Sequence, residues 1–200
     1  MTKASDLGRE AENFTVQFLK ENGFPHMERR RLSGAKDKGD LTGSPGLMWE
    51  VKHLGKGKRP RMSGWMREVD EQIVNANANY GILVVKPPGF GGRQAGKFWA
   101  IMRWYSWLDL GALAFDLGNH PLPTNMYVHS NAKLTQLGSR LVELDRIPGV
   151  DWVVHIPPRV PETRGLAVVT LERMVPILHA AGYGGHGVVA GAAERPVSGS

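Results

Sequence analysis

The 200-residue chain contains no cysteine, which excludes disulfides and thiolate-bound zinc. Its seven histidines are scattered, and none belongs to the H-E-x-x-H pattern of a helical zinc site. No stretch approaches the roughly 20 consecutive apolar residues of a membrane-spanning helix. The first residues also lack the apolar core of a secretory signal peptide. We therefore expect a soluble, intracellular protein with no membrane partner.

The net charge of +6 is concentrated in one part of the chain. Residues 26–67 contain eleven Lys or Arg and four Asp or Glu, a net charge of +7, whereas the remainder carries −1. Such a region favours a polyanionic partner, and we prefer nucleic acid to the alternative of a solvated basic loop. The cations expected to contact phosphates are Arg30, Arg31, Lys36, Lys38, Lys56, Lys58, Arg59 and Arg61.

Residues 38–52, inside this basic region, have the pattern of a β-hairpin. A short strand at 41–42 precedes the turn-forming sequence Gly-Ser-Pro-Gly at 43–46. The next strand, 47–52, is mostly apolar, so we expect it to be buried on both faces. The two strands are therefore predicted to fold back on each other at the turn.

The hairpin is expected to bring Asp40 beside Glu50, and strand alternation places Lys52 on the same face as Glu50. Burying such charges costs several kcal/mol per ion unless they are paired or bind a metal. A divalent cation such as Mg²⁺ relieves carboxylate repulsion, binds substrate phosphate and lowers the pKa of bound water, while a lysine can orient the nucleophile. The alternative is a surface hairpin in which Glu50 and Lys52 form a weak ion pair.

The rest of the chain alternates between helical and strand periodicity. Helices are predicted over residues 6–22, 64–79, 106–116, 131–145 and 171–181. Strands are predicted over 24–32, 41–42, 47–52, 80–86, 97–103, 126–129, 151–156 and 166–170. Ser63 and the Ser106–Asp109 box are expected to cap the second and third helices. Up to residue 116 the order is α-β-β-β-α-β-β followed by a short helix.

The first predicted helix carries one acidic residue at the edge of its apolar stripe. The stripe consists of Leu7, Ala11, Phe14 and Phe18. Glu12 follows Ala11 directly, so it is half turned toward the core. The alternatives are that Glu12 is an ordinary exposed glutamate, or that the nearby Glu10 takes its place.

Several short motifs occur in a fixed order over residues 6–103. They are Gly8 with Glu12, Gly23-Phe24, Arg31, Ser33-Gly34, Asp40 and Glu50-Val51-Lys52. Together they resemble the PD-(D/E)XK nuclease superfamily, and within it the archaeal-type Holliday-junction resolvases and their phage counterparts. The chain departs from that pattern at Gly39, where the family has proline, and residues 117–200 have no counterpart that we can place.

The resemblance implies roles for particular residues. The implied catalytic set is Glu12, Ser33, Asp40, Glu50 and Lys52. The implied ligands of Mg²⁺, with Mn²⁺ as a substitute, are Asp40, Glu50, the Val51 carbonyl and Glu12. Lys52 would position or activate the water, and Ser33 would contact the scissile region.

The resemblance also implies an α/β fold with a restriction-endonuclease-like core, a central mixed sheet flanked by helices. The expected parts are a nuclease core at 1–116, an α/β extension at 117–182 and a disordered tail at 183–200. The expected activity is metal-dependent cleavage of branched DNA, such as a four-way junction, in the cytoplasm of a bacterial or phage-infected cell. Because a junction needs two symmetric nicks, we expect a homodimer.

Three alternatives stay open at this point. The first is a related nuclease that acts on linear or single-stranded DNA in phage replication, packaging or restriction. The second is a DNA-binding protein of the same fold that does not cut. The third is an RNA-binding accessory protein, which exposed aromatics on a sheet would favour. Four tryptophans that lie on or beside predicted core strands are instead expected in the core, and they are Trp49, Trp99, Trp104 and Trp107.

Overall fold

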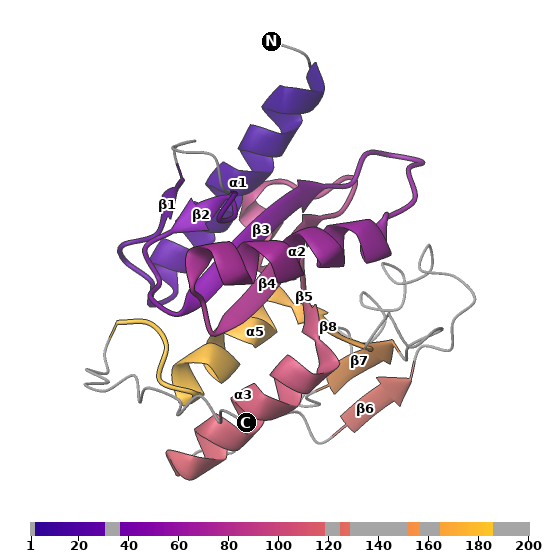
Figure 1. Ribbon diagram of the computed structural model, residues 1–200. Coiled ribbons are helices and arrows are strands. Elements are labelled where there is room, and N and C mark those ends of the chain that lie inside the picture. The colour runs from indigo at the N-terminus through magenta and orange to yellow at the C-terminus, as the bar shows by residue number, and fades with distance from the viewer. Residues whose placement is uncertain (1–2, 31–36, 119–124, 129–151, 157–164, 186–200) are drawn as a thin grey trace.

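A single mixed β-sheet flanked by helices organises the computed structural model (Figure 1). The residues described are 3–30, 37–118, 125–128, 152–156 and 165–185. Within them the sheet has eight strands in the order β1-β2-β3-β4-β5-β8-β7-β6. The expected α/β class and the order α-β-β-β-α-β-β followed by a helix are confirmed.

The first five strands are β1 (Glu28–Arg29), β2 (Leu41–Thr42), β3 (Leu47–His53), β4 (Tyr80–Lys86) and β5 (Trp99–Arg103). The other strands are β6 (Asn125–Val128), β7 (Trp152–Ile156) and β8 (Leu166–Thr170). The helices are α1 (Lys3–Glu21), α2 (Met62–Ala76), the 3₁₀-helix η1 (Gly92–Lys97), α3 (Trp104–Asp116) and α5 (Leu171–Ala180). Strands β3 and β4 are parallel, as are β6 and β7, and the other neighbours are antiparallel.

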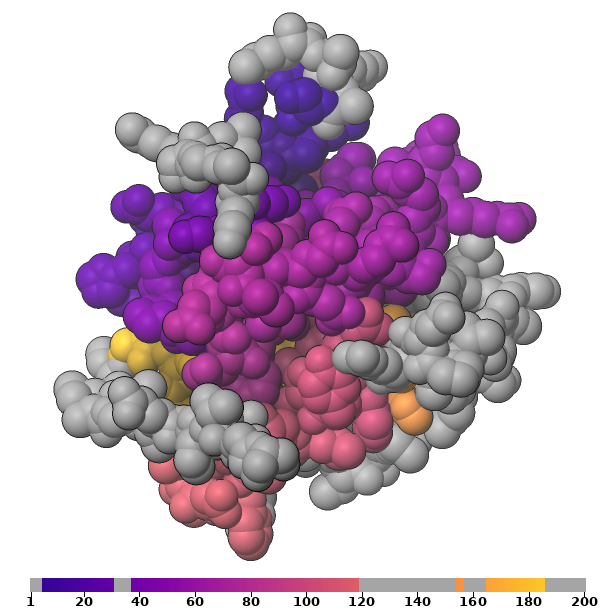
Figure 2. Space-filling model, viewed as in Figure 1, coloured from indigo at the N-terminus to yellow at the C-terminus, as the bar shows by residue number. Residues whose placement is uncertain are grey.

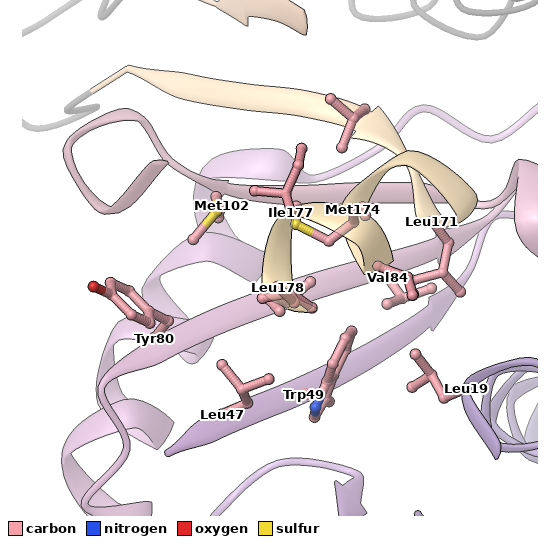
Figure 3. Packing of buried hydrophobic residues seen from close by; sticks show 14 of the residues in the cluster. Leu19, Leu47, Trp49, Tyr80, Val84, Met102, Leu171, Met174, Ile177 and Leu178 are labelled. Atoms are coloured by element: carbon pink, nitrogen blue, oxygen red, sulfur yellow. The ribbon is translucent and has the colours of Figure 1, made fainter. Parts of the chain in front are cut away.

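The helices divide between the two faces of the sheet. Helices α1, α3 and α5 pack with one face in a large buried cluster, whereas α2 packs with the other face in a second cluster. Figure 3 shows the first cluster, in which Leu178 of α5 lies among residues of the central strands. Trp49, Trp99 and Trp107 are buried as expected, and the partly buried Trp104 stacks on His155 with ring centroids 4.1 Å apart.

The segment beyond residue 116 continues the same sheet and core. Strand β8 pairs with β5 along its whole length, from Thr170 opposite Trp99 to Leu166 opposite Arg103. Helix α5 contributes Leu171, Met174, Ile177 and Leu178 to the cluster that also contains Leu19 and Trp49 (Figure 3). The sheet and the hydrophobic core thus continue across residue 116, which is the boundary that we expected between the nuclease core and the extension.

Some local expectations were wrong. Of the strand predicted at 24–32, the described part, 24–30, forms only the two residues of β1, both exposed at the sheet edge. Neither Ser63 nor Ser106 caps a helix, because α2 begins after Arg61 and α3 follows directly from β5. Ser106 is buried in the first turn of α3 instead. A strand that runs straight into a helix leaves no loop residue free to act as a side-chain cap.

Two expectations concern residues that the structure only partly describes. The helix predicted at 131–145 lies outside the described residues. Of the tail predicted at 183–200, only 183–185 are described, and there the Tyr183 ring packs edge-on against Tyr80 at a centroid distance of 5.9 Å.

Gly43, in the β2–β3 turn, provides a test of the hairpin. Its φ is +104°, and a Cβ there would lie 1.9 Å from the His26 carbonyl oxygen. We predict that Gly43→Ala lowers the free energy of unfolding by about 3 kcal/mol, measured by urea denaturation. Gly8→Ala is the control, since no described heavy atom lies within 4 Å of a Cβ at that position in α1. It should raise stability by about 1 kcal/mol, and a similar loss in both variants would contradict this account.

Candidate active site

The β2–β3 hairpin holds Asp40 against the backbone of β3. Leu41 pairs with Trp49, and the Asp40 amide donates to the Trp49 carbonyl at 2.8 Å. The Asp40 side chain then accepts a hydrogen bond at Oδ2 from the Val51 amide, also at 2.8 Å. The predicted hairpin is therefore confirmed, and it fixes the carboxyl of Asp40 next to the residue that separates Glu50 from Lys52.

Glu50 and Lys52 point toward α2, on the opposite face from Val51. Val51 belongs to the buried cluster around α1, whereas the Lys52 ammonium contacts Glu50 Oε1 and lies 2.8 Å from Glu68 Oε2 of α2. The alternation expected from the strand pattern is confirmed. The surface-hairpin alternative is contradicted, because Glu50 is only 4% exposed.

Helix α2 supplies two contacts that the sequence analysis missed. Gln72 Nε2 donates to Glu50 Oε2 at 2.9 Å and to Asp37 Oδ2 at 2.8 Å, and Glu68 lies one helical turn earlier. Gln72 is 3% exposed, and its Oε1 has no hydrogen-bond partner among the described residues. The sequence does contain a signal that could have identified Gln72. It is a polar residue on the buried stripe of a helix, three residues after Val69.

Glu12 rather than Glu10 lies on the Asp40 side of α1. Glu12 Oε2 accepts from Arg29 Nε at 2.5 Å, and its charge acts on Asp40. Glu10 Oε1 instead lies 3.9 Å from Lys86 Nζ, toward β4. The described residues hold no group of three His, Cys, Asp or Glu side chains placed to bind a metal. The role of Glu12 as a third carboxylate ligand stays a prediction.

The electrostatics favour a cation between Asp40 and Glu50. Burial, followed by the charge of Glu50, raises the pKa of Asp40 to about 7, and Glu12 adds to the rise. The Val51 hydrogen bond and Lys52 oppose that rise. Two close carboxylates, one of which resists ionisation, fit a hard divalent cation, which would displace the proton.

Lys52 is held as a cation. Burial alone would lower the pKa of Lys52, but its contacts with Glu50 and Glu68 raise it above the usual value. Because Glu68 is a second partner, the ammonium stays anchored when Glu50 takes another ligand. The arrangement can therefore offer a fixed positive charge beside a carboxylate pair.

The basic residues around the site are only partly described. The Arg30 amide donates to the Asp40 carbonyl at 2.7 Å, so this arginine lies beside the hairpin. Arg31, Ser33 and Lys36 lie outside the described residues. Figure 2 shows the surface over α2 and the loop before it. The exposed predicted cations are Lys38, just before the hairpin, and Lys56, Lys58, Arg59 and Arg61 in the loop before α2.

Comparisons with protein-family models, with curated proteins and with solved structures each give no match. Among the described residues, no helix has the length and apolar character needed to cross a bilayer. The features that bear on function are therefore the geometry of Asp40, Glu50 and Lys52 and the charge around them.

The raised pKa of Asp40 predicts that the metal-free protein loses stability as pH rises. The stabilising contribution of its protonated form is complete below the ordinary pKa of 3.8 and is lost as pH rises through about 7. Urea denaturation in EDTA between about pH 5 and about pH 8 should show this decline. Asp40→Asn keeps an acceptor for the Val51 amide and should flatten the decline. An unchanged profile in the variant would assign the decline to other groups.

Proposed function

We propose that this protein is a metal-dependent endonuclease that hydrolyses the phosphodiester backbone of DNA, with branched DNA as its preferred substrate. The observation that carries the proposal is the pair of half-buried Asp40 and buried Glu50 beside the cationic Lys52, inside the basic region of the chain. A protein that only binds DNA gains nothing from carboxylates next to phosphates, because like charges repel.

Asp40, Glu50 and the Val51 carbonyl would hold Mg²⁺ or Mn²⁺, which lowers the pKa of bound water and neutralises charge on the phosphate. Lys52 orients the attacking water and stabilises the negative charge that develops on the phosphoryl oxygens. The water oxygen forms a bond to phosphorus as the bond to the leaving sugar oxygen breaks, and the water proton passes to solvent. Glu68 keeps Lys52 in position while Glu50 is engaged.

The fold supports the same proposal. The order α1-β1-β2-β3-α2-β4, with β3 parallel to β4, agrees with the order expected from the resemblance to PD-(D/E)XK nucleases. We infer a restriction-endonuclease-like core that uses β2 and β3 for its catalytic carboxylates. The preference for branched DNA and the homodimer follow from the resemblance to Holliday-junction resolvases, since paired nicks require two-fold symmetry.

Glu50→Gln tests the chemistry. It preserves shape but weakens metal binding, so cleavage should fall by about 1,000-fold, equivalent to about 4 kcal/mol of barrier. DNA affinity in EDTA should stay equal or increase, because a charge that repels phosphate is removed. The assay compares a labelled four-way junction with a matched linear duplex, in Mg²⁺ and in EDTA. Glu71→Gln is the matched control, since Glu71 is exposed on α2, the helix that packs against Glu50.

The outcomes of this assay separate the candidates. Paired nicks on the junction alone, lost in EDTA and in Glu50→Gln, support the full proposal. Equal cutting of both substrates keeps the nuclease and rejects the preference for branched DNA. Tight binding without cutting in Mg²⁺ indicates a DNA-binding protein, and wild-type cutting by Glu50→Gln rejects the site.

The exposed cations of the loop between β3 and α2 should contribute to binding rather than to chemistry. We predict that neutralising Lys56, Lys58, Arg59 and Arg61 to Gln weakens DNA binding. The slope of log affinity against log salt should become shallower by up to about 3.6, since each phosphate contact contributes about 0.9. Single-turnover cleavage at saturating protein should change little. An unchanged salt slope would exclude this loop from the DNA contact.

A further inference from the structure

Lys86, the last residue of β4, is a nearly buried ammonium with only weak compensation from the described residues. The residue is 5% exposed, yet its Nζ lies 3.9 Å from Glu10 Oε1 and 6.0 Å from the centre of the Phe14 ring. Both values lie at the outer limit of an ion pair and of a cation–π contact. Removing an ammonium from water costs several kcal/mol unless close partners replace the hydration. Lys86 therefore retains a strong capacity to bind an anion.

His53 lies beside Lys86 on the neighbouring strand. The parallel register of β3 and β4 pairs the two residues directly. The Nδ1 atom of His53 is buried and has no hydrogen-bond partner among the described residues. Buried polar atoms are almost always paired, so this position has one unused donor or acceptor next to one poorly paired cation.

This pair lies where the basic loop leaves the sheet. The Leu54 amide donates to the Lys86 carbonyl at 3.0 Å, and the exposed cations at 56–61 follow directly. His53 also follows Lys52, the lysine of the candidate active site, by one residue. Side chains alternate along β3, so His53 lies with Val51 on the face toward α1, whereas Lys52 faces α2. The pair is thus placed to meet a backbone phosphate held beside the basic loop.

We propose that Lys86 and His53 form a subsite for a DNA backbone phosphate on the α1 face of the sheet, where the basic loop begins, with the Glu10 carboxylate occupying its entrance in the free protein. The proposal rests on the proposed DNA-cleaving function. The incoming phosphate displaces Glu10, which is 42% exposed, and accepts a close hydrogen bond from the Lys86 ammonium. His53, in its Nδ1-protonated tautomer, donates to a second phosphate oxygen. The subsite adds a fixed backbone contact to those of the basic loop.

The test is DNA affinity in EDTA over a series of salt concentrations, so that no cleavage is needed. Lys86→Met should weaken binding and reduce the salt slope by about 0.9, the value for one phosphate contact. Glu10→Gln should tighten binding more than the control Asp6→Asn, which removes an exposed charge one helical turn away on α1. The extra gain should vanish in the double variant with Lys86→Met, since the two residues act on the same phosphate.

Three results would overturn the subsite. The first is an unchanged salt slope in a Lys86→Met protein that melts like wild type. The second is a gain from Glu10→Gln that persists fully without Lys86. The third is an equal effect of Glu10→Gln and Asp6→Asn, and this comparison decides the matter if Lys86→Met does not fold.

A failure of the proposed function is recognisable separately. If the wild-type protein binds no DNA, inorganic phosphate becomes the probe, and the His53 ring resonances in NMR spectra are the readout. Shifts induced by phosphate in wild type and absent in a control with Lys86→Met support the anion site without the nuclease. The absence of any shift in wild type overturns the subsite.

Discussion

Strand β3 is buried on both faces, and this constraint determines where each candidate catalytic group lies. Side chains alternate along a strand, so one face of β3 joins the core under α1 and α5 while the other meets α2. The side chains of Glu50 and Lys52 face α2, so their charges must be paired by residues of that helix or by a bound ligand. Glu68 and Gln72 are those partners, which is why a helix with no catalytic residue of its own is essential to the site.

The candidate site has an excess of negative charge that its neighbouring groups do not fully neutralise. Both oxygens of Glu50 are engaged, one by Lys52 and the other by Gln72, yet Asp40 still resists ionisation near neutral pH. Such an arrangement is less stable than an apolar core of the same shape, and a bound divalent cation would reverse the deficit. The carboxylate pair that would serve the proposed function therefore lowers the stability of the protein as long as no cation is bound.

Local patterns made part of this structure predictable. The Gly-Ser-Pro-Gly turn and the apolar strand after it were sufficient to place Asp40 against β3, because turn and alternation depend on neighbouring residues. The partners on α2 were not predictable, since contacts such as Gln72 with Asp37 join residues far apart in sequence. The insertion of β8 beside β5 was missed for the same reason, and the helix caps failed where a strand led directly into a helix.

The late position of β8 and α5 in the chain has a consequence for biosynthesis. Leu171 and Leu178 cover the same core as Trp49, so the N-terminal half cannot complete its interior until residues 166–180 have left the ribosome. Synthesis proceeds at about 5–20 residues per second, so the face of β3 and β4 that α5 covers stays without that cover for several seconds. During this interval the apolar side chains of that face are accessible to chaperones.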